Sequence, residues 1–401
     1  MLDPVPPPPE WLRELIGPWA LRLKSPALTD HIHEVVITFV GYLLIHYVLS
    51  PWLSPRLFPE HYPKLNKRTK LNWDVHVVSL IQSTFINAVA LWVLFVDEER
   101  KSMTPSERVF GYTGSCVLIS SLAVGYFIYD LIVSTIYVKM FGIGMLFHAV
   151  SALWVFSFGY RPFVNFYAPV FILYELSSPF LNIHWFLDKV NMTGSSLQWY
   201  NGMALLVVFF SCRLVWGTWQ SVIVYMDMYA ALKQTWSATP SSPFNPIDIT
   251  AQVFQARDDG SLCINEACVR ANAEISKYSK YTAGGVPTWL VLTYVTSNII
   301  LNGLNYYWFS KMIETVMKRF RGPSTPTSQK ASSSETKNST EHNKENSAIE
   351  DLAQQAVLDA ASKLEEEEGS LFLGDNASTQ PTASGIDAGV SHEIRSRKAQ
   401  S

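Results

Sequence analysis

Three ionisable side chains lie inside successive apolar segments of this chain: Asp130, His148 and Glu175. Ionisable groups at bilayer depth are costly, so they usually face the interior of a helix bundle or a wet cavity. Arg213 is a cation deep in a later apolar segment and needs a counterion, for which Asp130 and Glu175 are the candidates. An imidazole supported by a carboxylate can act as a base, and a guanidinium suits a phosphate or carboxylate.

His148 has small residues about one helical turn away on both sides, so a partner helix can come close. Two interpretations stay open for it. In the first, the imidazole is a satisfied hydrogen-bond donor between helices. In the second, His148 is a catalytic base and Asp130 is the carboxylate that orients it. Arg213 has the same two alternatives, since it either pairs with a carboxylate to hold the bundle together or binds the charged group of a lipid.

Polar residues also follow helical spacing in two apolar segments. The first stripe contains His76, Ser79, Ser83 and Asn87, with Gln82 beside it, and the second contains Tyr294, Asn298, Asn302 and Asn305. Such stripes either bond neighbouring helices together or line a cavity. Glu175, Ser178 and Asn182 share a helical face that Pro179 interrupts, and freed backbone groups are tolerated only in buried or cavity-lining helix. The ligand-binding residues predicted from these patterns are Glu175, Arg213, Asn182, Ser178, His76, Gln82, Asn298 and Asn302.

The composition indicates a membrane protein, because 48% of the 401 residues are hydrophobic and only 16% are charged. The net charge of −3 does not suggest a nucleic-acid partner. The four cysteines do not form a convincing zinc pattern, so we expect no metal site. Cys263 and Cys268 are predicted to form a disulfide if their loop is lumenal. No cofactor is expected, apart from acyl-coenzyme A if the protein is an acyltransferase.

Apolar segments that approach the ~20 residues needed to cross a bilayer predict an all-α, polytopic membrane protein with about seven transmembrane helices. The predicted spans are residues 34–52, 75–96, 109–138, 141–158, 163–187, 199–232 and 286–311. Pro169 and Pro179 predict that the fifth span is kinked or broken.

Four regions follow from this pattern. They are an N-terminal segment with an interfacial helix (1–30), a first transmembrane helix with a basic loop (31–69), a six-helix membrane domain (70–321) containing a long loop (234–285), and a disordered tail (322–401). The tail is acidic at Glu365–Glu368, and its segment Ala348–Leu364 is predicted to form an amphipathic helix on binding a partner protein. The basic residues between the first two spans place that loop and the C-terminus in the cytosol and the N-terminus in the lumen.

Four blocks in the membrane domain resemble a known family. They are NWDVHVVS at 72–79, GYFIYDL at 125–131, MLFHA at 145–149 and ELSSPFLNIHW at 175–185. The chain is similar in these blocks to TLC-domain proteins, which include the ceramide synthases. The resemblance implies six helices around a lipid-accessible cavity, a location in the endoplasmic reticulum, and work in lipid synthesis, sensing or trafficking.

The chain departs from the ceramide synthases at their histidine pair. His148 matches the first histidine and Ala149 replaces the second, while the downstream acidic motif is absent. The chain therefore resembles the non-synthase branch. Our first hypothesis is a lipid-homeostasis protein that binds, senses or moves a lipid or acyl chain; the alternative is an acyltransferase with His148 as base. A seven-helix receptor or transporter fits less well, because the receptor motifs and internal repeats are missing.

Overall fold

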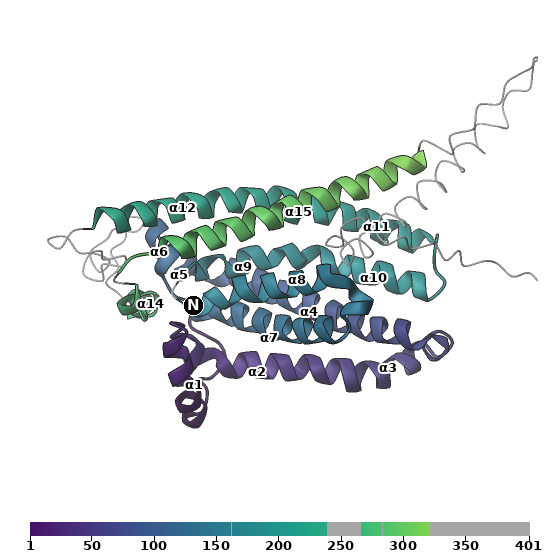
Figure 1. The fold of residues 1–401 in the computed structure, drawn as a ribbon, viewed down its shortest axis with the longest axis horizontal. Helices are drawn as coiled ribbons and strands as arrows, with labels where there is room; N and C mark the ends of the chain where they lie inside the picture. The colour runs from purple at the N-terminus through teal and green to yellow at the C-terminus, as the bar shows by residue number, and fades with distance from the viewer. Residues whose placement is uncertain (162, 239–265, 283, 321–401) are drawn as a thin grey trace, which may run out of the picture.

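The protein is an all-α polytopic membrane protein. Its structure, a computed structural model, describes residues 1–401 except 162, 239–265, 283 and 321–401, and those described residues contain no strand (Figure 1). By length and composition, four helical stretches of the described part can cross a membrane: Leu28–Leu57, Lys67–Val96, Pro105–Ile136 and Ser196–Ser237. The other three predicted spans fall on further apolar helices, so the predicted fold class is confirmed.

In the described part of the chain, eight labelled α-helices lie before residue 158 and six lie after it. The first group is α1 (Glu10–Arg22), α2 (Leu28–Leu44), α3 (Ser50–Leu57), α4 (Lys67–Val96), α5 (Glu98–Lys101), α6 (Pro105–Phe110), α7 (Gly114–Ile136) and α8 (Val138–Ser157). The second group is α9 (Ala168–Phe171), α10 (Ser178–Lys189), α11 (Ser196–Phe209), α12 (Gly217–Ser237), α14 (Glu266–Ile275) and α15 (Thr288–Phe320).

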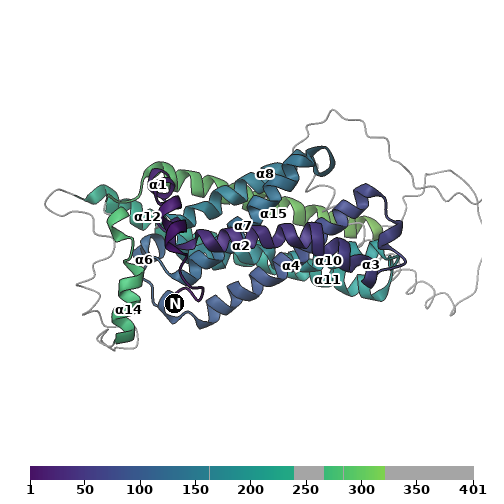
Figure 2. The same ribbon diagram turned by 90° about the horizontal axis from the view of Figure 1, so that it is seen from below.

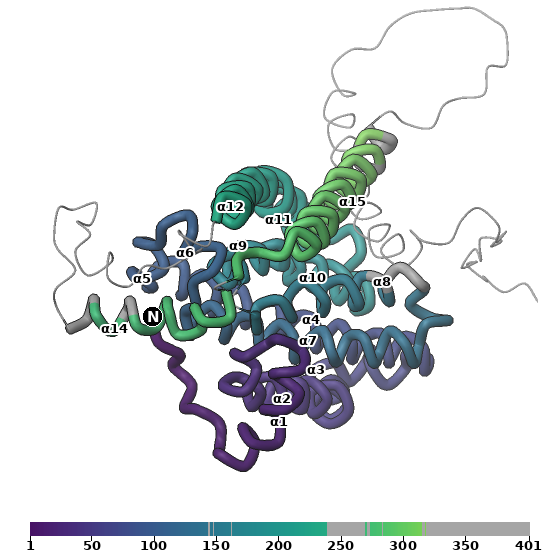
Figure 3. Tube along the Cα trace, turned by 60° about the vertical axis from the view of Figure 1, so that its left-hand side comes forward, coloured from purple at the N-terminus to yellow at the C-terminus, as the bar shows by residue number. Residues whose placement is uncertain are grey.

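The long helices run along the longest axis of the molecule, while α1 and α14 lie at one end (Figure 1). Figure 2 shows α2 passing across α7, and Figure 3 shows α2 and α15 on opposite sides with α7 and α8 between them. The share of buried residues also places α7 inside the bundle and α2 at its surface. In the most apolar window of the stretch that contains α7, 72% of residues are buried, against 22% in the stretch that contains α2. The core is therefore built around α7.

The fifth predicted span is broken, as its prolines predicted. It consists of α9, a 3-10 segment at Ile172–Ser177 and α10. Pro179 lies in the first turn of α10, where its missing N–H costs no helical hydrogen bond. The break in the helix leaves the backbone carbonyl of Tyr174 free to accept a hydrogen bond from a side chain. Arg213 Nε donates this hydrogen bond at 2.9 Å.

The sixth predicted span is one continuous helical stretch with a π-helical segment, Phe210–Trp216, between α11 and α12. A π-helical turn widens the helix locally and occurs often at functional sites. Arg213 and Cys212 lie in this segment, and both are buried. The predicted segment thus lies within one helical stretch, Ser196–Ser237, whose 42 residues are more than one span requires.

The long loop returns to one end of the bundle. The Tyr112 backbone N–H donates to the Ile275 carbonyl at 3.1 Å, and the Gly114 N–H donates to Glu274 Oε1 at 2.6 Å. These contacts hold α14 against the start of α7. Cys263 and the side chain of Cys268, the predicted amphipathic segment at Ala348–Leu364 and the acidic tail all lie outside the described part of the chain.

Candidate functional site

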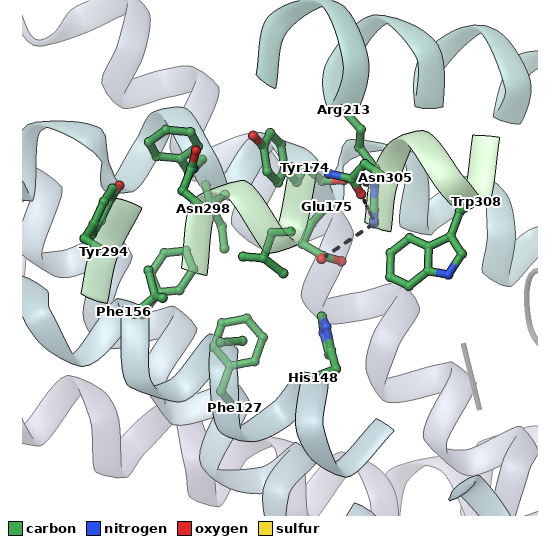
Figure 4. A pocket seen from close by; sticks show the side chains of 15 residues that line it. Phe127, His148, Phe156, Tyr174, Glu175, Arg213, Tyr294, Asn298, Asn305 and Trp308 are labelled. Carbon is green, nitrogen blue, oxygen red and sulfur yellow. Dashed lines mark hydrogen bonds and ion pairs between the residues drawn. The ribbon is translucent and has the colours of Figure 1, made fainter. Parts of the chain in front are cut away.

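A cavity lies between α7, α8, the 3-10 segment after α9, the π-helical segment and α15 (Figure 4). The cavity has a volume of about 80 Å³. Most of the wall is apolar and aromatic, with Phe127, Val155, Phe156, Phe171, Ile172 and Leu301. The polar groups of the wall come from His148, Tyr174, Glu175, Arg213, Tyr294, Asn298, Asn305 and Trp308.

Arg213 is fixed by hydrogen bonds from two of its nitrogens. Nε donates to the Tyr174 carbonyl at 2.9 Å and to Ser177 Oγ at 3.2 Å, and Nη1 donates to Asn305 Oδ1 at 3.2 Å. The guanidinium also lies over the Phe209 ring, 5.0 Å from its centre. The π-helical segment therefore places the Arg213 guanidinium at the cavity, where hydrogen bonds to the neighbouring backbone and side chains fix its position.

The Glu175 carboxylate lies beside the Arg213 guanidinium in the cavity wall. Its Oε1 lies 3.9 Å from Arg213 Nη2, and its Oε2 accepts a hydrogen bond from Ser178 Oγ at 2.6 Å. The Glu175 side chain is 20% exposed, so its carboxylate is not sealed off from the cavity. Glu175 is one of the two counterions, beside Asp130, that the sequence suggested for Arg213.

His148 approaches from the opposite wall. A non-helical residue, Gly142 with φ of 82°, separates the first turn of α8 from the rest of the helix, so the part that carries His148 takes its own direction. The imidazole meets the Phe127 ring edge-on at 6.4 Å between centres and points toward Glu175 in Figure 4. Within the described residues it makes no hydrogen bond, so both ring nitrogens are available to a ligand.

The polar stripe of α15 serves two purposes. Asn302 Nδ2 donates to Ser221 Oγ at 2.8 Å, and Asn302 Oδ1 accepts from the Tyr174 hydroxyl at 3.1 Å. Asn298 Oδ1 accepts from the Tyr225 hydroxyl at 2.6 Å while Asn298 also lines the cavity. This stripe therefore bonds α15 to α12, and it supplies two asparagines to the cavity wall, Asn298 and Asn305.

The stripe of α4 lies elsewhere. His76 Nδ1 is 2.7 Å from Asn182 Oδ1, and Asn182 Nδ2 donates to Ser79 Oγ at 3.0 Å. The His76 ring stacks on Trp185 at 4.2 Å between centres. These contacts join α4 to α10, and none of the residues lines the cavity described above.

Three other predicted site residues also lie outside the cavity lining. Gln82 is 1% exposed, and its amide has no hydrogen-bond partner among the described residues. Asp130 Oδ1 accepts from Ser134 Oγ at 3.4 Å, one turn along α7. Ser178 reaches the site only through its hydrogen bond to Glu175. The structure thus brings His148, Glu175, Arg213 and Asn298 together in the cavity lining, which does not include Asp130.

Sequence reasoning did not assign Tyr174, Asn305 or Trp308 to the site. Asn305 was visible as a member of the α15 stripe, and its bond to Arg213 completes the guanidinium contacts. Trp308 follows Asn305 by one helical turn, and its ring centre lies 6.0 Å from the Arg213 guanidinium. Tyr174 carried no signal, because its role depends on the break in the chain that exposes its carbonyl to Arg213.

Comparison with known proteins gives a consistent result. The family model described as the TLC domain matches residues 72–314. A TLC domain-containing protein of Schizosaccharomyces pombe is 33% identical over 79% of this chain and 89% of its own length. Topoisomerase I damage affected protein 4 of Saccharomyces cerevisiae is 30% identical over 76% of this chain and 91% of its own length.

A more distant relative is human TLC domain-containing protein 4, which is 29% identical over 44% of this chain and 67% of its own length. No solved structure matches the chain. None of the three relatives is described as a ceramide synthase, in agreement with the replacement of the second histidine by Ala149. The chain belongs to the TLC-domain family, outside the ceramide synthases.

Proposed function

We propose that this protein acts in lipid homeostasis by binding, sensing or moving a lipid or acyl chain in its helix bundle. The observation that carries the proposal is the composition of the cavity wall. Aromatic and aliphatic side chains form most of the wall, while Arg213, Glu175, Asn305 and His148 gather along one part of it. An apolar chain suits the first part, and the polar part of a lipid suits the second.

The polar groups are arranged for binding an amphipathic molecule. Arg213 is already held by three hydrogen bonds, so it need not reorganise when a ligand arrives. Glu175 leaves the guanidinium incompletely neutralised, because the ion pair between them is 3.9 Å long. An incompletely neutralised cation beside an apolar cavity favours a phosphate or carboxylate headgroup.

Photo-crosslinking tests this proposal. The full-length protein in detergent micelles is irradiated with a diazirine-bearing fatty acid and, separately, with a diazirine-bearing phospholipid. Ala152→Trp places an indole in the cavity wall and is expected to lower labelling severalfold. Val207→Trp is the matched control, because Val207 is 61% exposed on α11 and does not line the cavity. Equal labelling of both variants and the wild type would mean that the lipid binds elsewhere.

A second function, lipid acyl transfer, is favoured by one observation. His148 is free of hydrogen bonds to the described residues and points into the cavity, as a general base must. Glu175 lines the cavity together with His148, whereas Asp130 is not among the lining residues. Purified protein given labelled acyl-coenzyme A and candidate lipid acceptors separates the two functions. Product that disappears in His148→Ala supports transfer, whereas lipid binding without turnover supports a binding role.

The location proposed for the protein is the endoplasmic reticulum membrane, with the N-terminus in the lumen and the C-terminus in the cytosol. Basic residues support this orientation. The connection from α3 to α4 and the start of α4 carry Lys64, Lys67, Arg68 and Lys70, and α3 lies at the end of the bundle away from α1 in Figure 1. Protease digestion of sealed microsomes that carry an epitope tag at either end tests the orientation. A C-terminal tag removed without detergent and an N-terminal tag protected until detergent is added are the expected results.

A further inference from the structure

Three side chains that can ligate a metal meet at the end of the bundle that holds α1. His31 Nδ1 lies 2.9 Å from Glu34 Oε1 and 3.1 Å from Asp3 Oδ2. These three ligand atoms are all within 4.8 Å of one another. His31 and Glu34 are three positions apart near the start of α2, so they project from the same face of the helix. Asp3 joins them from the N-terminal segment.

The burial of this cluster leaves one oxygen unexplained. His31 and Glu34 are 1% and 3% exposed, and Glu34 Oε2 has no hydrogen-bond partner in the described part of the chain. A buried carboxylate oxygen without a partner is costly, and such groups call for a proton, an ion or a water. The unpartnered oxygen belongs to the same carboxylate that contacts His31.

The charges of the cluster also do not balance by themselves. Two carboxylates face one imidazole, so a protonated His31 with both carboxylates ionised leaves a net charge of about −1 in a buried place, which a proton or a cation must neutralise. A divalent cation bound to both carboxylates and to a neutral imidazole brings the sum to zero. Metal binding would therefore remove a buried charge that otherwise requires a proton shared by Asp3 and Glu34.

Neighbouring groups hydrogen-bond to the candidate ligands and orient them, as the residues around a metal site do. The Tyr112 hydroxyl lies 2.6 Å from His31 Nε2, which leaves Nδ1 for the metal when Nε2 carries the proton. Asp3 Oδ1 accepts the Val5 N–H at 2.9 Å, which leaves Oδ2 facing His31. His33 Nε2 lies 4.0 Å from Glu34 Oε1, within reach of a fourth ligand position.

We propose that Asp3, His31 and Glu34 bind a divalent first-row transition metal, with zinc as the expected ion. One imidazole and two carboxylates form a nitrogen and oxygen ligand set that Zn²⁺ and its neighbours accept, and a water or His33 can take the fourth position. The bound ion joins the N-terminal segment to α2. The site lies apart from the cavity, so it does not depend on the proposed lipid function.

The experiment uses the full-length protein purified in detergent micelles and treated with a chelator. Zinc is titrated into it by calorimetry, and the metal retained after gel filtration is counted by plasma mass spectrometry. We expect one zinc ion for each wild-type chain. Glu34→Gln and Asp3→Asn preserve side-chain size but remove a ligand charge, so each should weaken zinc affinity by at least about 100-fold.

Asp188→Asn is the matched control, because Asp188 Oδ2 pairs with Lys189 at 2.8 Å on α10 and takes no part in the cluster. It should bind zinc like the wild type. Cobalt adds a measurement that needs no variant, since Co²⁺ in a tetrahedral nitrogen and oxygen site gives visible absorption that zinc removes. A wild-type protein that binds neither ion, or zinc binding that survives both Glu34→Gln and Asp3→Asn, overturns the proposal. The first of these results would mean that Asp3 and Glu34 share a proton instead.

Discussion

Arg213 and Glu175 face each other in the cavity wall without forming a close ion pair. Their nearest charged atoms, Nη2 and Oε1, are 3.9 Å apart, while each residue has shorter bonds to neutral partners. Arg213 bonds to the Tyr174 carbonyl, and Glu175 accepts from Ser178. The two charges are thus held in place separately, and an anionic group can approach the guanidinium without first breaking a tight salt bridge.

Glu175→Ala should destabilise the protein moderately. The substitution removes the acceptor of the Ser178 hydroxyl and the long ion pair, but Arg213 keeps its three hydrogen bonds. We expect a loss of about 1–2 kcal/mol in the free energy of unfolding, seen as a lower midpoint of thermal unfolding in detergent. Glu175→Gln retains an acceptor for Ser178 and should recover most of that loss. Unchanged stability of the alanine variant would argue against a structural role for this carboxylate.

Two arginines should respond differently to replacement by lysine. Arg108 donates to Asp227 from both Nε, at 2.5 Å, and Nη2, at 2.7 Å, and neither residue lines the cavity. Arg108→Lys loses this paired contact and should lower the free energy of unfolding by about 2 kcal/mol. Arg213→Lys should lower it similarly and also reduce photo-labelling by an anionic lipid. Equal labelling of the two variants would show that Arg213 does not contact the headgroup.

The sequence predicted which polar residues lie inside apolar helices, but not the neighbour toward which each one points. Asp130 and His148 both lie inside apolar helices, but Asp130 accepts a hydrogen bond from Ser134 and does not line the cavity. Spacing of three and four residues correctly placed His76 and Ser79 on one face of α4. Whether that face meets a cavity or another helix depends on how α4 crosses α10, and this crossing is set by contacts distant in the sequence.

The cluster of Asp3, His31 and Glu34 shows the same limit. His31 and Glu34 have helical spacing that sequence can reveal, but Asp3 lies in a proline-rich segment with no regular structure. Only the return of that segment to the start of α2 brings its carboxylate 3.1 Å from His31. By contrast, the break in the fifth span was predictable, because proline acts on its own local backbone.

Asn182→Ala should weaken the contact between α4 and α10 without changing the cavity. The amide of Asn182 bonds to His76 on one side and to Ser79 on the other, so its loss removes one hydrogen bond from each of them. We expect the free energy of unfolding to fall by about 2 kcal/mol. A double-mutant cycle with Ser79→Ala should give a coupling of at least about 0.5 kcal/mol, whereas additive effects would contradict a direct contact.

Gly125 permits the close approach of α7 to α2. A Cβ at this position would lie 2.8 Å from the Val35 carbonyl oxygen and 2.8 Å from Thr38 Cβ, and backbone cannot move aside cheaply. Gly125→Ala should therefore force the two helices apart and lower the free energy of unfolding by about 1–3 kcal/mol.

Gly41→Ala on α2 is the matched control, because nothing lies within 4 Å of the added Cβ. Alanine there should be neutral or stabilise the helix by up to about 1 kcal/mol. Wild-type stability of Gly125→Ala, measured beside Gly41→Ala in the same detergent, would show that α2 does not pack against α7 at this distance.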